Sequence, residues 1–180
     1  MIYGDEIRFR APERDDIPRF VDWLNNPDVL AGLTIYLPIS QEMEKNWFDE
    51  MLKARHEEHP FVIEILKDNI WKMIGNIGFS GLDYRNRSAE VGIFIGETKY
   101  WDSGYGTQAM NLMLKHGFRT LNLNRIMLRV FSDNQRAIRV YEKCGFVHEG
   151  NLRQAIFSNG SYKDEIIMSV LFNEWTSKST

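Results

Sequence analysis

The chain has 180 residues, a length that fits one domain better than two. Hydrophobic residues are 43% of the total, which provides a buried core and excludes a disordered chain. The net charge of -3 comes without a long basic run, and no apolar run approaches the roughly 20 residues of a membrane span, so neither nucleic acid nor membrane is expected as a partner. The single cysteine, Cys144, excludes an internal disulfide, and the polar N-terminus lacks the apolar middle of a secretion signal, so we expect a cytoplasmic protein.

Hydrophobic periodicity divides the chain into strands and helices. In chain order the predicted segments are strand Ile7–Arg10, helix Glu13–Asn25, helix Gln41–Arg55 with Ser40 as its N-cap, strands Phe61–Leu66 and Trp71–Phe79, strand Glu90–Ile95, helix Gly104–Leu121, strand Ile126–Phe131, helix Asn134–Cys144, and a closing hairpin of Phe146–Phe157 and Tyr162–Phe172. This order predicts a mixed α/β chain with a largely antiparallel sheet and one central β-α-β unit.

The stretch from His56 to His59 resembles a metal site at first sight. It is not HExxH, and two histidines three residues apart are weak evidence for a metal. The stretch lies at the polar end of a predicted helix, before Pro60. A solvated helix terminus is therefore favoured, and no metal is expected.

Gly104-Tyr105-Gly106 lies between a predicted strand and a predicted helix. Glycine permits a sharp turn and close approach of a ligand to the backbone, and the first amides of a helix have no internal partners. Together with the helix dipole, these amides form a natural site for phosphate or pyrophosphate. A loop that merely needs flexible residues is the alternative. With Ala109 the turn also fits the GxGxxA motif of dinucleotide-binding folds. Such folds need an acidic residue about 20 residues further on, but the segment there, Arg125–Arg129, is basic. NAD binding is therefore the weaker hypothesis.

Asn134 and Tyr141 are seven residues apart and lie near one face of the following helix, with the small Ala137 between them. An amide and a phenol that flank a small residue form a slot for a slender polar chain. Taken singly, Asn134 reads better as an N-cap and Tyr141 as a core aromatic. Their joint spacing downstream of the glycine turn favours the slot.

From IRFRAPERDD to the last strand, and most specifically from AEVGIFIG through YEKCGF, the sequence resembles the GNAT superfamily of N-acetyltransferases. Within it, the sequence is similar to the branch with ribosomal-protein alanine and spermidine/spermine N-acetyltransferases, of which the tail GNLRQAIFSNGSYKDEIIMSVL is also typical. The resemblance implies a GNAT-like domain over residues 1–175, a C-terminal tail over 176–180, and a mostly antiparallel sheet of about seven strands. It further implies that the sheet splays apart near residues 95 and 131 and that acetyl-CoA lies in the gap.

The family motif Q/R-x-x-G-x-G/A falls on Trp101-Asp102-Ser103-Gly104-Tyr105-Gly106. The resemblance implies that backbone amides of this stretch, with Thr107, hold the CoA pyrophosphate. Trp101 departs from the Gln or Arg of the motif, which puts a role for that side chain in doubt. Ile93 and Ile95 are expected to pair by backbone with the pantetheine arm, and Asn134 to hydrogen-bond it.

The implied chemistry is direct attack of a primary amine on the thioester, without a covalent enzyme intermediate, so Cys144 is expected to be a core thiol. Tyr141 would protonate the leaving thiolate, since a phenol keeps its proton at neutral pH. Glu90 is the candidate base, with a structural carboxylate as the alternative, and Asp164 a candidate substrate contact. The acceptor would be a small amine or a protein N-terminus, and a homodimer is possible. A CoA-binding module without turnover is the alternative function.

Overall fold

The computed structural model describes residues 1–177. Its strands are β1 (Ile2–Tyr3), β2 (Ile7–Arg10), β3 (Phe61–Lys67), β4 (Ile70–Asp83), β5 (Ser88–Ile95), β6 (Arg125–Phe131), β7 (Val147–Ser158) and β8 (Ser161–Leu171). Its helices are α1 (Ile17–Leu24), α2 (Pro27–Leu30), α3 (Gln41–Met51), α4 (Tyr105–Arg119), α5 (Gln135–Lys143) and α6 (Phe172–Ser177), and short 3₁₀ turns lie at Arg14–Asp16, His56–Glu58 and Thr98–Tyr100.

Within residues 1–177 the strands form one eight-stranded sheet in the order β1-β2-β3-β4-β5-β6-β8-β7. Among the strand pairs described, β5 with β6 is the parallel one, with α4 as its crossover, and the other pairs are antiparallel. The predicted mixed, mostly antiparallel fold is thus confirmed. These residues do not form the doubly wound parallel sheet that a dinucleotide-binding fold for NAD would need.

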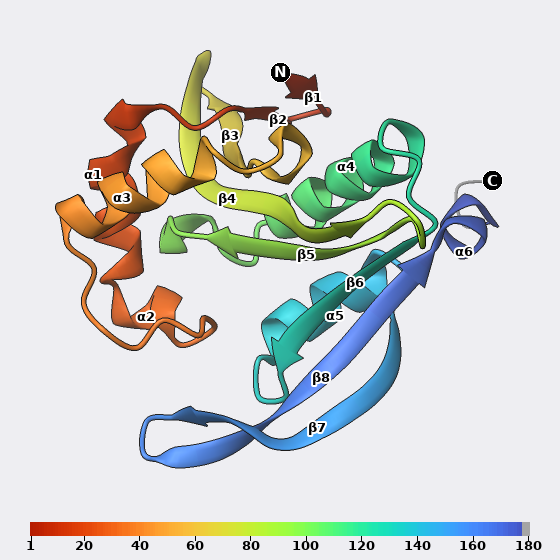
Figure 1. The fold of residues 1–180 in the computed structure, drawn as a ribbon. Coiled ribbons are helices and arrows are strands. Elements are labelled where there is room, and N and C mark those ends of the chain that lie inside the picture. Colours follow the sequence, from red (N-terminus) through yellow and green to blue (C-terminus); the bar gives the residue numbers. More distant parts are fainter. Residues whose placement is uncertain (178–180) are drawn as a thin grey trace.

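The sheet splits between β5 and β6. The two strands pair only at Ser88–Arg125, Ala89–Ile126 and Glu90–Met127 and then diverge, as Figure 1 shows. Beyond Glu90 the edge of β5 that faces β6 therefore has no strand partner. The predicted splay is present, and α1–α3 gather beside the open ends of the two strands.

The main core lies between the sheet and α4. Met110, Met113 and Leu114, predicted on one apolar stripe, are fully buried there. Gly117 brings the helix close to the sheet, because a Cβ at this position would lie 2.7 Å from side-chain atoms of Ile126 and Phe79. This contact holds α4 against the sheet, with its N-terminus at the split between β5 and β6.

Several predicted boundaries were wrong for local reasons. The helix expected from Glu13 begins as the 3₁₀ turn and becomes α1 only at Ile17, followed by Pro18, which suits a first helical turn because it lacks an N–H. The helix expected to reach Arg55 ends at Met51.

Some elements were not predicted at all: β1, the one-turn α2, which Asn26 caps, and α6. Thr176 and Ser177, placed in the predicted tail, belong to α6, while 178–180 lie outside the described residues.

Candidate active site

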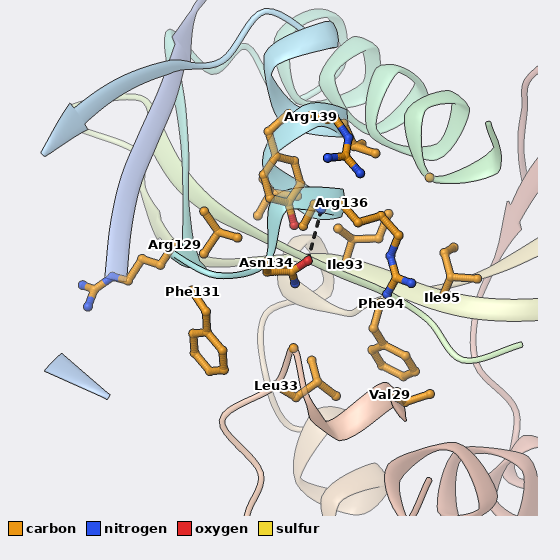
Figure 2. A pocket seen from close by; sticks show the side chains of 18 of the residues that line it. Val29, Leu33, Ile93, Phe94, Ile95, Arg129, Phe131, Asn134, Arg136 and Arg139 are labelled. Atoms are coloured by element: carbon orange, nitrogen blue, oxygen red, sulfur yellow. Dashed lines mark hydrogen bonds between the residues drawn. The ribbon is translucent and has the colours of Figure 1, made fainter. Parts of the chain in front are cut away.

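The split between β5 and β6 opens into a cavity of about 750 Å³. Figure 2 shows α5 on one side of this main cavity and Val29 and Leu33 on the other. The predicted site residues that line it are Glu90, Ile93, Ile95, Trp101, Gly104, Gly106, Thr107, Asn134 and Tyr141. The lining does not include Ser103, Tyr105 or Asp164. Residues up to 51 positions apart, from Glu90 to Tyr141, are thus brought to one surface.

The glycine turn leads directly into α4. Gly104 is the N-cap, with a φ of 84°, a left-handed conformation that suits glycine because it has no Cβ. Gly106 is different, since its φ is not positive and a Cβ there would find only Val140 Cγ2, at 4.0 Å. Packing therefore leaves empty space at Gly106, on the cavity side of the first turn. The N–H groups of Tyr105, Gly106 and Thr107 have no carbonyl four residues back within the helix, so they are available to an anion.

Trp101 anchors this loop. Its indole N–H donates to the carbonyl oxygen of Ile95 at 2.7 Å, and its ring lies 3.4 Å from the guanidinium carbon of Arg136 on α5. Ser103 is exposed, and its hydroxyl donates to the carbonyl oxygen of Trp101 at 3.2 Å. The Tyr105 side chain is buried in the core against Tyr100, so only its backbone can face an anion.

The free edge of β5 presents backbone groups to the main cavity. Gly96 N donates to Ile74 O of β4 at 2.9 Å, and the register pairs Ile95 with Gly75 and Ile93 with Ile77. In an antiparallel pair the hydrogen-bonded positions alternate, so the N–H and C=O groups of Ile93 and Ile95 point away from β4 and toward the gap. The Ile95 carbonyl is already bonded to Trp101, which leaves the Ile95 N–H and both groups of Ile93.

Three cations that the sequence reasoning missed line the cavity from α5: Arg136, Arg139 and Lys143. Their spacing of three and four residues places them on one helix face, a signal that the sequence already contained. Within residues 1–177 the structure records no ion pair for any of the three, although Arg136 stacks on Trp101. Unpaired cations beside the first turn of α4 give this end of the cavity the charge that suits phosphate groups.

Asn134 is the N-cap of α5 and also lines the main cavity. Its Oδ1 accepts from Ala137 N at 3.2 Å, the N-cap bond that Figure 2 draws as a dashed line. Its Nδ2 is therefore the group left for a ligand, and it lies 3.0 Å from where a Cβ of Gly32 would be. The cap fixes the amide in place at the cavity edge.

Tyr141 lies one helical turn before Cys144, and both are buried. Burial, with a smaller effect from Cys144, raises the pKa of Tyr141 to about 12, so the phenol keeps its proton throughout the neutral range. No hydrogen bond to its hydroxyl is recorded among the described residues, and Tyr141 lines the cavity. Burial likewise raises the pKa of Cys144 to about 12, and its Sγ lies 3.7 Å from Thr107 O. The predicted core thiol is confirmed.

Glu90 lies deeper in the gap, near a second carboxylate. Its Oε2 is 3.7 Å from Arg129 Nε, while Arg129 Nη1 is 3.6 Å from Oε2 of the buried Glu165. All three residues line the cavity. Arg129 and Glu165 were not singled out from sequence, because tertiary structure sets the pairing of β6 with β8, in which Arg129 lies opposite Ile167 and Glu165 opposite Phe131.

Asp164 lies on the β7–β8 hairpin, outside the lining of the main cavity. Its carboxylate accepts from Asn151 Nδ2 at 2.7 Å and from Gln154 N at 2.8 Å, bonds that span an irregular part of the β7–β8 hairpin. These hydrogen bonds, that of the Gln154 backbone first, lower the pKa of Asp164. Its side chain stabilises the hairpin and does not line the main cavity, and its role as a substrate contact stays a prediction.

His56 and His59 stack edge to face with ring centroids 5.2 Å apart, and Nε2 of His59 is 3.2 Å from Ala54 O. Over residues 1–177 no group of three or more His, Cys, Asp or Glu is arranged to hold a metal ion. In the same residues no helix is long and apolar enough to cross a membrane.

Comparison with known proteins agrees with this geometry. The family profile described as acetyltransferase (GNAT) domain matches residues 6–147, which is most of the sequence. The chain therefore belongs to the GNAT acetyltransferases and is an acetyl-CoA-dependent N-acetyltransferase. The family expected from the sequence is confirmed.

Two curated relatives and one solved structure show which members it resembles. Spermidine N(1)-acetyltransferase of Vibrio cholerae is 32% identical over 182 aligned positions, covering 98% of this chain and 99% of that protein. A putative ribosomal N-acetyltransferase of Bacillus subtilis is 32% identical over 103 positions, 57% of this chain and 56% of the relative. The crystal structure of spermidine N-acetyltransferase from Vibrio cholerae in complex with CoA and spermine matches with a TM-score of 0.87 at 28% identity, over 96% of this chain and 99% of the other.

Proposed function

We propose that this enzyme moves the acetyl group of acetyl-CoA to a primary amine by direct attack of the amine nitrogen in a ternary complex. The observation that carries the proposal is that the first turn of α4, a free strand edge and the hydroxyl-bearing ring of Tyr141 line a single cavity. The first feature suits a pyrophosphate, the second an amide-containing arm, and the third a leaving thiolate.

In the proposed complex the pyrophosphate of CoA accepts hydrogen bonds from the first amides of α4, close to Gly106. Arg136, Arg139 and Lys143 neutralise the phosphates from α5. The pantetheine amides pair with the free N–H and C=O groups of Ile93 and the N–H of Ile95, and Asn134 Nδ2 donates to the same arm. The thioester then lies deeper in the gap, toward Tyr141 and Glu90.

The proposed chemistry needs three proton movements. The acceptor ammonium, with a usual pKa near 10.4, gives a proton to Glu90, directly or through water. The amine nitrogen then forms a bond to the thioester carbon, which gives a tetrahedral oxyanion, and the C–S bond breaks as Tyr141 gives its proton to the departing sulfur. The nitrogen loses its second proton to the Tyr141 phenolate, directly or through water, which leaves a neutral amide and restores the phenol. A strand amide stabilises the oxyanion. Most of the rate enhancement comes from holding the two reactants in line.

The acceptor class follows from the relatives only as a proposal. Their names include spermidine, and a neighbouring structure contains spermine, so an aliphatic amine is the acceptor that we favour. A protein N-terminus is the alternative that the ribosomal relative suggests. A homodimer and a cytoplasmic location stay predictions.

The test is a steady-state assay of CoA thiol release with acetyl-CoA and a panel of amines and N-terminal peptides. We expect release to depend on an amine, and double-reciprocal plots for the two substrates to intersect, as a ternary complex requires. Parallel plots would point to an acetylated enzyme and contradict direct attack. Binding of acetyl-CoA by calorimetry without turnover on any amine would leave the chain as a CoA-binding module.

A further inference from the structure

A second cavity, of about 420 Å³, lies between the N-terminal helices and the sheet. It shares Leu33, Thr34 and Phe94 with the main cavity, so the two adjoin beside the C-terminal end of β5. Its remaining wall comes from α1, α3, the segment between α2 and α3, and β4. We call this second cavity the acceptor pocket. Its volume lies in the lower part of the usual range for small-molecule sites, about 300–1,000 Å³.

The walls of the acceptor pocket are mainly hydrocarbon and aromatic. Phe20 and Trp47 meet edge to face with ring centroids 6.1 Å apart, and Phe94 and Met43 also line the pocket. The segment from Ala31 to Ile39 contributes no charged residue. Such walls suit an aliphatic chain, and the aromatic faces also attract a cation.

One ionisable group lines this pocket, the carboxyl group of Glu44 on α3. Glu44 is only 6% exposed, and among residues 1–177 the structure records neither a hydrogen bond nor an ion pair for its carboxyl group. The neighbouring Lys45 pairs instead with Glu42, on the exposed side of the helix. Burial raises the pKa of Glu44, which reflects the cost of a carboxylate without a cation in this environment.

Asn76 on β4 adds a second unpartnered polar group. Its Nδ2 atom is buried without a hydrogen-bond partner in the part of the chain that the structure describes. The terminal amide can turn by half a rotation, so Oδ1 can take the place of Nδ2. An ammonium, with three N–H donors, could then bond to both Glu44 and the amide oxygen of Asn76, with the aromatic rings beside it.

We propose that the acceptor pocket holds the far end of the acceptor amine, an aliphatic arm that ends in one ammonium paired with Glu44. This inference rests on the proposed acetyl transfer, with the reacting nitrogen in the main cavity. Because the pocket offers a single carboxyl group, it fits an α,ω-diamine better than an amine with two or more distal charges. An unpaired second ammonium in an apolar pocket would cost more than it gains.

The experiment compares 1,5-diaminopentane with hexylamine, which replaces the distal ammonium by a methyl group of similar size. We expect the wild-type kcat/KM for the diamine to exceed that for hexylamine about 10-fold or more, the usual scale for a buried charged hydrogen bond. Glu44→Gln should lower this ratio about 10-fold, through KM for the diamine, and Glu44→Leu should abolish or reverse it. Glu42→Gln, an exposed change on the same helix, should keep both rates and their ratio.

Three results would overturn the assignment. The first is a wild-type ratio near one, and the second is a ratio that Glu44→Gln leaves unchanged. The third is a kcat/KM for spermidine well above that for the diamine. Melting temperatures of both Glu44 variants at or above wild type would show that folding is not the cause, since each removes a buried carboxyl group. If acetyl-CoA binds but no amine is acetylated, the proposed transfer fails. Calorimetry with the diamine in the presence of CoA then tests the assignment of the acceptor pocket separately. Diamine binding that Glu44→Gln weakens would support the assignment, and no binding would refute it.

Discussion

Replacing Gly106 by alanine should change stability and cofactor affinity in opposite directions. The backbone at Gly106 is not in a left-handed conformation, and the added Cβ would meet only Val140 Cγ2 at 4.0 Å. The protein itself thus has room for the methyl group, and loss of glycine flexibility in the unfolded chain should stabilise the fold by about 0.5 kcal/mol. For a chain of this length that corresponds to a rise in Tm of about 1–2 °C.

The same methyl group would occupy space in front of the first-turn amides of α4, where we place the pyrophosphate. We expect the Kd for acetyl-CoA to rise at least about 10-fold for Gly106→Ala, equal to 1.4 kcal/mol, and further for Gly106→Val. Calorimetry gives the affinity, and a thermal melt gives the stability. An affinity within about twofold of wild type, with the variant folded, would refute the pyrophosphate assignment.

Gly104→Ala is the matched contrast. Its φ of 84° is unfavourable for a residue with a Cβ, so this variant should lose about 1–2 kcal/mol of stability. A loss of affinity there would follow from strain as readily as from a blocked ligand. Only the pair of variants separates the two causes.

Three further predictions concern other parts of the site. Arg136→Met should raise the Kd for acetyl-CoA about 10-fold and weaken its salt dependence, because a cation beside the phosphates is lost. The control is Arg85→Met, a change at an exposed arginine. If Arg136→Met binds acetyl-CoA as tightly as Arg85→Met, Arg136 does not belong to the phosphate site. Cys144 should react slowly with thiol reagents at pH 8 in the native protein and quickly once it unfolds, since burial raises its pKa to about 12; rapid native reaction would contradict this. Burial raises the pKa of Glu44 above its ordinary 4.5, so the native state disfavours the charged carboxylate. The wild type should therefore lose stability relative to Glu44→Gln as pH rises above that value. Chemical unfolding of both proteins between pH 4 and 8 should show a difference in free energy of unfolding that widens with pH, and a constant difference would contradict the buried environment of Glu44.

The sequence predicted the long elements of the fold well, because their apolar residues repeat with a clear period. The stripe on α4 and the strand of Glu90–Ile95 are examples, whereas the split in the sheet was expected from the resemblance to the GNAT superfamily. The one-turn α2 and the two-residue β1 were missed, since so few residues carry no periodic signal. Helix ends were displaced where a 3₁₀ turn or an early stop replaced regular helix, as at Arg14–Asp16 and Met51.

Prediction of the site depended on how local each feature was. The glycine turn and the pair Asn134–Tyr141 each lie on a short continuous segment. The spacing within the second segment predicted that Asn134 and Tyr141 share one helix face, and the position of this helix downstream of the glycine turn favoured a common site. The hydrogen bonds of Asp164 across the hairpin were not predicted, because they depend on an irregular region that has no distinct pattern in the sequence. Glu44 was also missed, because a carboxylate on an amphipathic helix looks solvent-exposed until the surrounding elements bury it.

The most direct test of the proposed mechanism is the single-turnover rate of acetyl transfer by Tyr141→Phe, measured on an amine that wild type acetylates. The change removes only the hydroxyl and keeps the ring, which packs against Phe146 with centroids 5.9 Å apart, so fold and acetyl-CoA affinity should change little. We expect the rate to fall about 100-fold or more, the usual scale for loss of a positioned general acid. A single-turnover rate equal to that of wild type would make Tyr141 a core aromatic only, and the leaving thiolate would then take its proton from water or another residue.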